Sequence, residues 1–122
     1  MADKESHLRQ YRKNKNLANS DLLASKIYRD WKVTVIFYAT MHLMDSTYSD
    51  IYPKHNTHEK RKNFIGRTLP YKNVIDEYTE LENLSRRSRY DCIPIEMEEV
   101  KQAEELMECI EEFAKGLNSP AS

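Results

Sequence analysis

The residues with the clearest capacity for chemistry are His58 and Arg61, which lie three positions apart in the segment HEKR. This spacing places an imidazole and a guanidinium on one face of a helix, near an amino-terminal end whose free amides attract anions. The histidine could move a proton to or from an RNA oxygen, and the arginine could stabilise charge in the transition state, without a metal ion. The alternative is a solvated basic helix start, because this spacing alone carries little information.

A second basic cluster lies in the segment SRRSRYD, residues 85–91. In an RNA-binding site, Arg86 and Arg89 would hold the phosphate backbone, and Tyr90 would stack on a base or bind a phosphate. The alternative is structural, because arginines in the last turn of a helix complement its dipole and can pair with the glutamates that follow along the chain.

His42 is the third candidate, because it interrupts an otherwise apolar stretch. Tyr38 lies one turn before it and Asp45 lies three residues after it, so all three share one face of a helix. A buried histidine needs partners for both ring nitrogens. His42 is therefore either a structural residue that is hydrogen-bonded within the core or a second catalytic group beside His58 and Arg61.

Several common classes of function lack their sequence signals. The chain has no glycine-rich phosphate loop, no zinc-ligand spacing and no GxSxG motif. Its two cysteines, Cys92 and Cys109, are too few and too far apart for a metal site, and free thiols are typical of a reducing cytosol. The amino-terminal segment contains no apolar signal-peptide region. We therefore expect a cytoplasmic protein without a metal ion or another cofactor.

These residues need elements to position them, and the stretch over residues 30–45 is the central one. Its apolar residues occupy every side of a helix, which is typical of the centre of a bundle or of a membrane span. It is shorter, at roughly 15 residues, than the ~20 that a bilayer requires. We therefore predict a buried central helix that is capped by Asp30, continues to about Tyr48 and does not enter a membrane.

Four further helices are predicted, and the last two carry clear apolar stripes at i, i+3 and i+4 spacing. The four cover residues 4–18, 57–67, 71–90 and 96–116. Asn56 is a favoured cap for the second of them, and Gly116 is placed to end the last. Only two glycines occur, which argues against a β-sandwich or barrel. The expected fold is all-α, a single up-and-down five-helix bundle over residues 1–117, with a flexible tail at 118–122.

Charge is unevenly distributed along the chain, although the net charge is only −1. Lys and Arg outnumber Asp and Glu by 14 to 7 in residues 1–72, whereas the ratio is 5 to 13 in residues 73–122. The basic part could meet an anion such as RNA. The alternative is that the basic and acidic surfaces attract each other across protomers.

A longer pattern connects these segments. It reads DW-x-V-T-x-x-FYA-x-x-H, a loop, H-x-x-R, and then Y-x-x-L-x-x-x-S-R-x-x-RY. Its positions are Asp30, Trp31, Val33, Thr34, Phe37, Tyr38, Ala39, His42, His58, Arg61, Tyr78, Leu81, Ser85, Arg86, Arg89 and Tyr90. This ordered set, which covers about residues 5–115, resembles small HEPN-domain proteins (higher eukaryotes and prokaryotes nucleotide-binding). The resemblance implies an all-α up-and-down bundle that usually forms a homodimer.

The resemblance also implies two classes of function. Many HEPN proteins are metal-independent ribonucleases of toxin–antitoxin, CRISPR and other antiviral defence systems, and others are noncatalytic modules. The family's ribonucleases carry an arginine and then, after four to six residues, a histidine, and no histidine of this chain has an arginine at that spacing. Either His58 and Arg61 replace that motif in reversed order, or the domain is inactive.

The expected function is therefore an RNA-binding or metal-independent RNA-cleaving domain of a prokaryotic defence or toxin system. The alternative is a noncatalytic HEPN module that mediates dimerisation, nucleotide binding or partner-protein binding. The expected partners are a second copy of the chain, RNA, and a separately encoded partner or antitoxin protein. The candidate catalytic residues are His58, Arg61 and His42, and the candidate RNA- or phosphate-binding residues are Arg86, Arg89 and Tyr90.

Overall fold

The computed structural model describes residues 3–49 and 57–118 of the chain. In these ranges it contains five α-helices and no strand, which confirms the predicted all-α bundle. Three short 3₁₀ turns, η1, η2 and η3, lie between the helices. The helices are α1 (Lys4–Ala18), α2 (Arg29–Tyr48), α3 (His58–Arg67), α4 (Ile75–Tyr90) and α5 (Met97–Asn118), and the turns are Asp21–Leu23, Lys26–Tyr28 and Tyr71–Val74.

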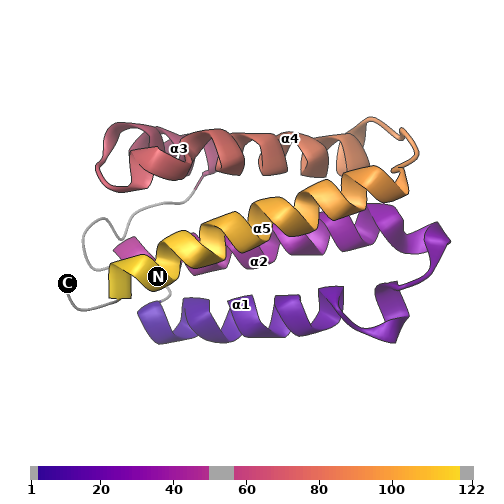
Figure 1. Ribbon diagram of the computed structural model, residues 1–122, viewed down its shortest axis with the longest axis horizontal. Coiled ribbons are helices and arrows are strands. Elements are labelled where there is room, and N and C mark those ends of the chain that lie inside the picture. The colour runs from indigo at the N-terminus through magenta and orange to yellow at the C-terminus, as the bar shows by residue number, and fades with distance from the viewer. Residues whose placement is uncertain (1–2, 50–56, 119–122) are drawn as a thin grey trace.

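The four long helices run antiparallel to their neighbours in chain order, with α2 in the middle (Figure 1). α2 packs against α1 on one side and against α4 and α5 on the other. The short α3 packs with η3 against the beginning of α4. Within the described part of the chain, no helix has both the length and the apolar character needed to cross a membrane.

Most of α2 is buried, as its composition predicts, although one stripe along the helix is only partly buried. Val33, Phe37 and Met44 are all inaccessible to solvent, and they belong to the same core cluster as residues of α4 and α5. Trp31 is 58% exposed, and the partly buried Val35, Tyr38 and His42 continue this stripe. A helix surrounded in this way must satisfy every polar side chain it carries through neighbouring helices, and this requirement shapes the candidate site.

The apolar stripes of α4 and α5 face α2 as predicted, apart from the first residue of the second stripe. Tyr78 and Leu81 of α4, and Ala103 and Ile110 of α5, are inaccessible to solvent. Met97, the first apolar residue of α5, is 47% exposed because it lies in the first turn of the helix, at the edge of the bundle.

The predicted amino-terminal caps differ from those observed. Asp30 does not cap α2, because the helix already begins at Arg29, and Asp30 lies in its first turn. A carboxylate there still favours the positive end of the helix dipole. Asn56 lies outside the described residues, and Thr57 caps α3 by accepting a hydrogen bond from the backbone N–H of Lys60.

Gly116 does not end α5. The helix continues through it to Asn118, so the glycine has an ordinary helical conformation. Residue 118, the first of the predicted tail, therefore belongs to α5, and residues 119–122 lie outside the described part. The predicted loop at 49–56 lies outside that part from residue 50 onward.

The basic and acidic parts of the chain meet within one protomer. Lys15 of α1 contacts Glu111 of α5 at 2.5 Å, and Tyr11 donates a hydrogen bond to the same carboxylate. Lys32 of α2 lies 3.8 Å from Glu104 of α5. These pairs join α1 and α2 to the acidic surface of α5, so attraction between protomers is not required to explain the charge pattern.

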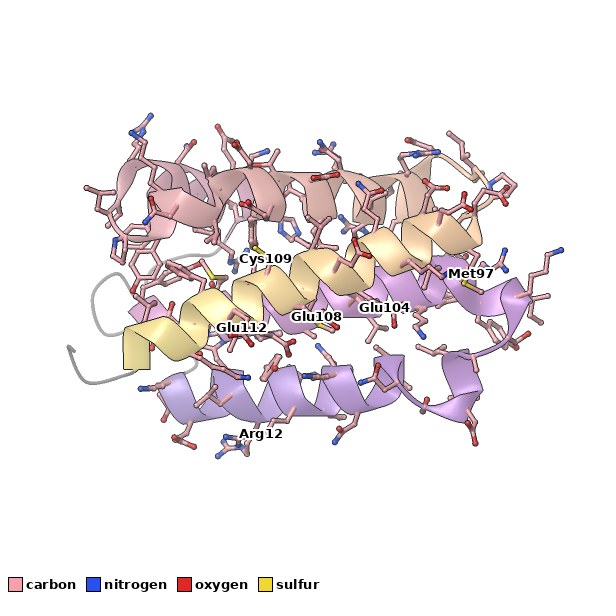
Figure 2. All side chains as sticks on the ribbon, in the orientation of Figure 1. Arg12, Met97, Glu104, Glu108, Cys109 and Glu112 are labelled. Carbon is pink, nitrogen blue, oxygen red and sulfur yellow. The ribbon has the colours of Figure 1, made fainter. Side chains whose placement is uncertain are left out.

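Other charged residues of these helices remain on the surface. The side chain of Arg12 points away from the bundle on α1, and the labelled glutamates follow the length of α5 (Figure 2). Those glutamates are Glu104, Glu108 and Glu112. Solvated faces of this kind are typical of surface helices.

The stripe of α5 gives a direct test of the packing. Ile110→Ala should lower the free energy of unfolding by about 2–5 kcal/mol, because it removes a fully buried side chain and leaves a cavity. Met97→Ala should cost less than about 1 kcal/mol, because that side chain is half exposed. Urea denaturation followed by circular dichroism measures both, and equal losses would contradict the observed orientation of the helix.

Candidate functional site

His58, Arg86, Arg89 and Tyr90 line one surface pocket of about 400 Å³, together with Glu82. The histidine is the first residue of α3, and the other four residues lie on α4. The structure therefore brings together one candidate catalytic residue and all three candidate phosphate-binding residues. α3 and α4 pack against each other, and the pocket lies between side chains of the two helices.

Arg89 is held in place by several contacts. Its Nη1 atom donates a hydrogen bond to the hydroxyl of Tyr38 at 2.9 Å, and its Nε atom donates to the carbonyl of Ser85 at 3.3 Å. The guanidinium carbon also lies 4.9 Å from the ring centre of Tyr90 and 5.5 Å from that of Tyr38, within the range of cation–π contact. A cation fixed in this way loses little conformational entropy when it binds an anion.

His58 lies half-buried beside aromatic rings. Its ring centre is 5.7 Å from that of Phe37 and 6.2 Å from that of Tyr38. Its Nδ1 atom is buried and has no hydrogen-bond partner among the described residues. Burial lowers the pKa of His58 below 6.5, and the positive charges of Arg61 and Arg89 lower it further. A neutral imidazole at pH 7 can accept a proton.

The charge of the pocket is positive overall. Glu82 is buried, and its carboxylate is paired with Lys62 of α3 at 3.0 Å. Arg86 is exposed, and Tyr90 is 68% exposed beside the cation of Arg89. The two arginines therefore determine the potential at the mouth of the pocket, which favours an anion, and the tyrosine offers a flat surface for stacking.

Arg87, the remaining arginine of this segment, has the structural role that the sequence left open as an alternative. Its Nη1 atom lies 2.7 Å from Glu99 of α5 and joins the end of α4 to the next helix. Two arginines of the segment therefore line the pocket, and one stabilises the bundle.

Arg61 does not line the pocket with His58, contrary to the expectation of a shared cleft. Its side chain is buried, and its Nε atom donates a hydrogen bond to Oδ1 of Asp45 at 2.9 Å. The hydroxyl of Tyr48 donates to the same oxygen at 2.8 Å. Although burial opposes the charge, the hydrogen bond and the charge of Asp45 raise the pKa of Arg61. The carboxylate of Asp45 is buried on α2 and needs a partner of opposite charge, which explains the inward position of Arg61.

His42 also lies away from His58. Its Nδ1 atom is 3.0 Å from Nδ1 of His7 on α1, and His7 in turn lies 4.0 Å from Oδ2 of Asp45. Burial and the nearby His7 lower the pKa of His42. His42 lines a different pocket, beside Trp31, so it is not a second catalytic group next to His58. Sequence reasoning missed His7, because a single histidine on a polar helix gives no local signal.

Comparisons with known proteins add no assignment to this geometry. No protein-family model matches the chain, and neither a curated protein nor a solved structure matches it. Cys92 and Cys109 are both free, as predicted, and both are exposed.

The buried pair between Arg61 and Asp45 predicts a large effect on stability. Asp45→Asn should lower the free energy of unfolding by about 3–5 kcal/mol, because it leaves the arginine charge buried and uncompensated. Glu112→Gln is the matched control, since its pair with Lys115 is 75% exposed on both sides and should leave the urea midpoint unchanged. A midpoint for Asp45→Asn within error of the wild type would contradict the proposed role of the pair.

The environment of His58 predicts a measurable titration. Its folded-state pKa should lie below 6.5, since burial and three arginines disfavour the charged ring while Glu82 favours it. Because the folded-state pKa is lowered, the stability contributed by His58 is complete above pH 6.5 and is lost as the pH falls through the folded-state value. NMR of the imidazole protons as a function of pH measures this pKa. The double variant Arg86→Ala/Arg89→Ala should raise it, whereas Arg87→Ala should not, and a wild-type pKa at or above 6.5 would contradict the described pocket.

Proposed function

We propose that this chain is an RNA-binding domain that cleaves RNA without a metal ion, and that its site is the pocket of His58, Arg86, Arg89 and Tyr90. The observation that carries the proposal is the position of the half-buried His58 imidazole in one open pocket with Arg86 and Arg89. A base and fixed cations are the two requirements for breaking a phosphodiester through the ribose hydroxyl of the RNA itself.

The reaction needs no group from outside the pocket except RNA. His58 takes the proton of a 2′-hydroxyl, the 2′-oxygen forms a bond to phosphorus, and the bond from phosphorus to the 5′-oxygen breaks. The protonated His58 then gives this proton to the departing 5′-oxygen. The products carry a 2′,3′-cyclic phosphate and a 5′-hydroxyl. Arg89 and Arg86 stabilise the charge that develops on the phosphoryl oxygens. Arg61, which we first expected in this role, instead holds Asp45.

The biological setting of the proposal comes from the resemblance to small HEPN-domain proteins. It suggests a cytoplasmic homodimer in a prokaryotic defence or toxin system, with an antitoxin or another separately encoded protein as its partner. A dimer would place two copies of the pocket in one assembly. Light scattering of the purified chain, which reports its mass in solution, tests this element of the proposal independently of RNA.

A second candidate function is a noncatalytic module that binds a nucleotide, an RNA or a partner protein through the same pocket. The pairing of Arg61 with Asp45 favours it, because His58 then has no second catalytic side chain from its own helix. Glu82 does not replace that group, because its carboxylate is buried and paired with Lys62.

An RNA-cleavage assay in EDTA tests both candidates. The wild type should cleave tRNA or total RNA, and His58→Gln should reduce the rate by at least about 100-fold while RNA binding is retained, because the general base is removed. Arg86→Ala/Arg89→Ala should weaken binding and reduce its salt dependence, because two phosphate contacts are lost. Arg87→Ala is the matched control from the same segment and should bind and cleave like the wild type.

The outcomes separate the two candidates. Cleavage that survives in His58→Gln would contradict the assignment of the site. Binding that depends on Arg86 and Arg89 without any cleavage by the wild type would favour the noncatalytic module. If the wild type does not bind RNA, the pocket is not an RNA site. Equal RNA binding by Arg86→Ala/Arg89→Ala and by Arg87→Ala would contradict the pocket in the same way.

A further inference from the structure

A second group of polar side chains lies outside the pocket, where α1 meets α2. It consists of His7 on α1 and of His42 and Asp45 on α2. Each of the three residues offers one ligand atom, and these atoms all lie within 4.8 Å of one another. We propose that this cluster is a binding site for a divalent transition-metal ion of the Zn²⁺ type, which joins α1 to the central helix.

The separations between the ligand atoms suit one ion. Nδ1 of His7 lies 3.0 Å from Nδ1 of His42 and 4.0 Å from Oδ2 of Asp45. In a tetrahedral zinc site with bonds of about 2.0–2.1 Å, neighbouring ligand atoms are about 3.3 Å apart. These two separations lie on either side of this value, and the ligand atoms of His42 and Asp45 lie within 4.8 Å of each other, so side-chain rotations could bring all three atoms to bonding distance.

The chemistry of the ligand atoms points to the same class of ion. Imidazole nitrogens and one carboxylate oxygen are a ligand set that zinc and its first-row neighbours accept, whereas Mg²⁺ and Ca²⁺ prefer a full set of oxygens. Three protein ligands leave a fourth position for water or an anion. The additional anion would balance the charge, because Arg61 already neutralises Asp45.

The surroundings of Asp45 already orient its carboxylate for this role. Oδ1 accepts hydrogen bonds from Arg61 and from Tyr48, which leaves Oδ2 on the side of the histidines. Outer contacts that fix a ligand in this way are typical of metal sites in proteins. Asp45 is buried, but His7 and His42 are only partly so, and a surface pocket of about 380 Å³ lined by His42 gives an ion access.

The sequence could not indicate this site. Its ligands are separated by 35 positions, between His7 and His42, so no short metal-binding motif occurs. The site becomes visible only when α1 packs on α2. It is separate from the pocket of His58, and it does not depend on the proposed cleavage of RNA, which is expected to proceed in EDTA.

In the absence of a metal, the two histidines have one other arrangement. One Nδ1 atom then carries a hydrogen and the other accepts the hydrogen bond, which forms an N–H···N bond between α1 and α2. The site would then bind no ion. This alternative is the outcome that contradicts the proposal.

Zinc titration of the chelator-treated, tag-free protein tests the site. All proteins carry Cys92→Ser/Cys109→Ser, because both exposed thiols would also bind zinc. Competition with a chromophoric chelator should give one Zn²⁺ per chain. His7→Gln should weaken binding by at least about 100-fold, because loss of even an outer contact typically costs about 10–100-fold. His58→Gln is the matched control and should bind like the wild type.

His7→Gln is preferred to a change of Asp45, because the carboxylate also pairs with Arg61 and its loss is expected to destabilise the fold. Circular dichroism confirms that each variant is folded, and Zn²⁺ should raise the melting temperature of every protein except His7→Gln. Co²⁺ should give visible absorption bands of a low-coordinate site in the wild type and not in His7→Gln. Failure of the folded wild type to bind Zn²⁺, or equal binding by His7→Gln and His58→Gln, would overturn the proposal.

Discussion

The buried ion pair between Asp45 and Arg61 joins the helix at the centre of the bundle to the short helix that carries His58. Arg61 and Ile65 are the two buried residues of α3, and further contacts with the bundle are made by the partly buried Phe64 and by Lys62. Asp45 on α2 is the hydrogen-bond partner of Arg61. The rings of Tyr48 and Tyr71 contact Phe64 nearby. The position of His58 relative to Arg89 therefore depends on a contact that is not part of the pocket.

The same carboxylate has two sides with different neighbours. Oδ1 faces the arginine and a tyrosine hydroxyl, whereas Oδ2 faces the histidine of α1. This division follows from the burial of α2, since a charged group in the middle of a bundle must be satisfied from every direction. Burial of Tyr48 beside Asp45 raises the pKa of its hydroxyl, which therefore remains a donor. The polar centre of the protein is one connected network that reaches three helices.

The sequence predicted the number and order of the helices well, because their apolar periodicity is a local property. It also predicted that Arg86, Arg89 and Tyr90 lie together, because residues this close on one helix are neighbours whatever the rest of the fold. The inward turn of Arg61 depends on α2 and α3 being side by side, and His7 gains its neighbours only through the packing of α1. The cap assigned to Asp30 was wrong because propensity favours a residue type and does not fix where the preceding turn ends.

The attachment of α1 has a consequence for how the molecule opens. Ala18 is the one residue of this helix that is buried, and α1 packs chiefly on α2. Tyr11 also packs against the core, and polar contacts join α1 to Glu111 and to His42. Because few side chains of α1 are fully buried, we expect its backbone amides to exchange sooner than those of α2, α4 and α5. Because the segment from residue 19 to 28 contains only two short turns, it can serve as a hinge. Opening there would uncover the face of α2 on which α1 packs.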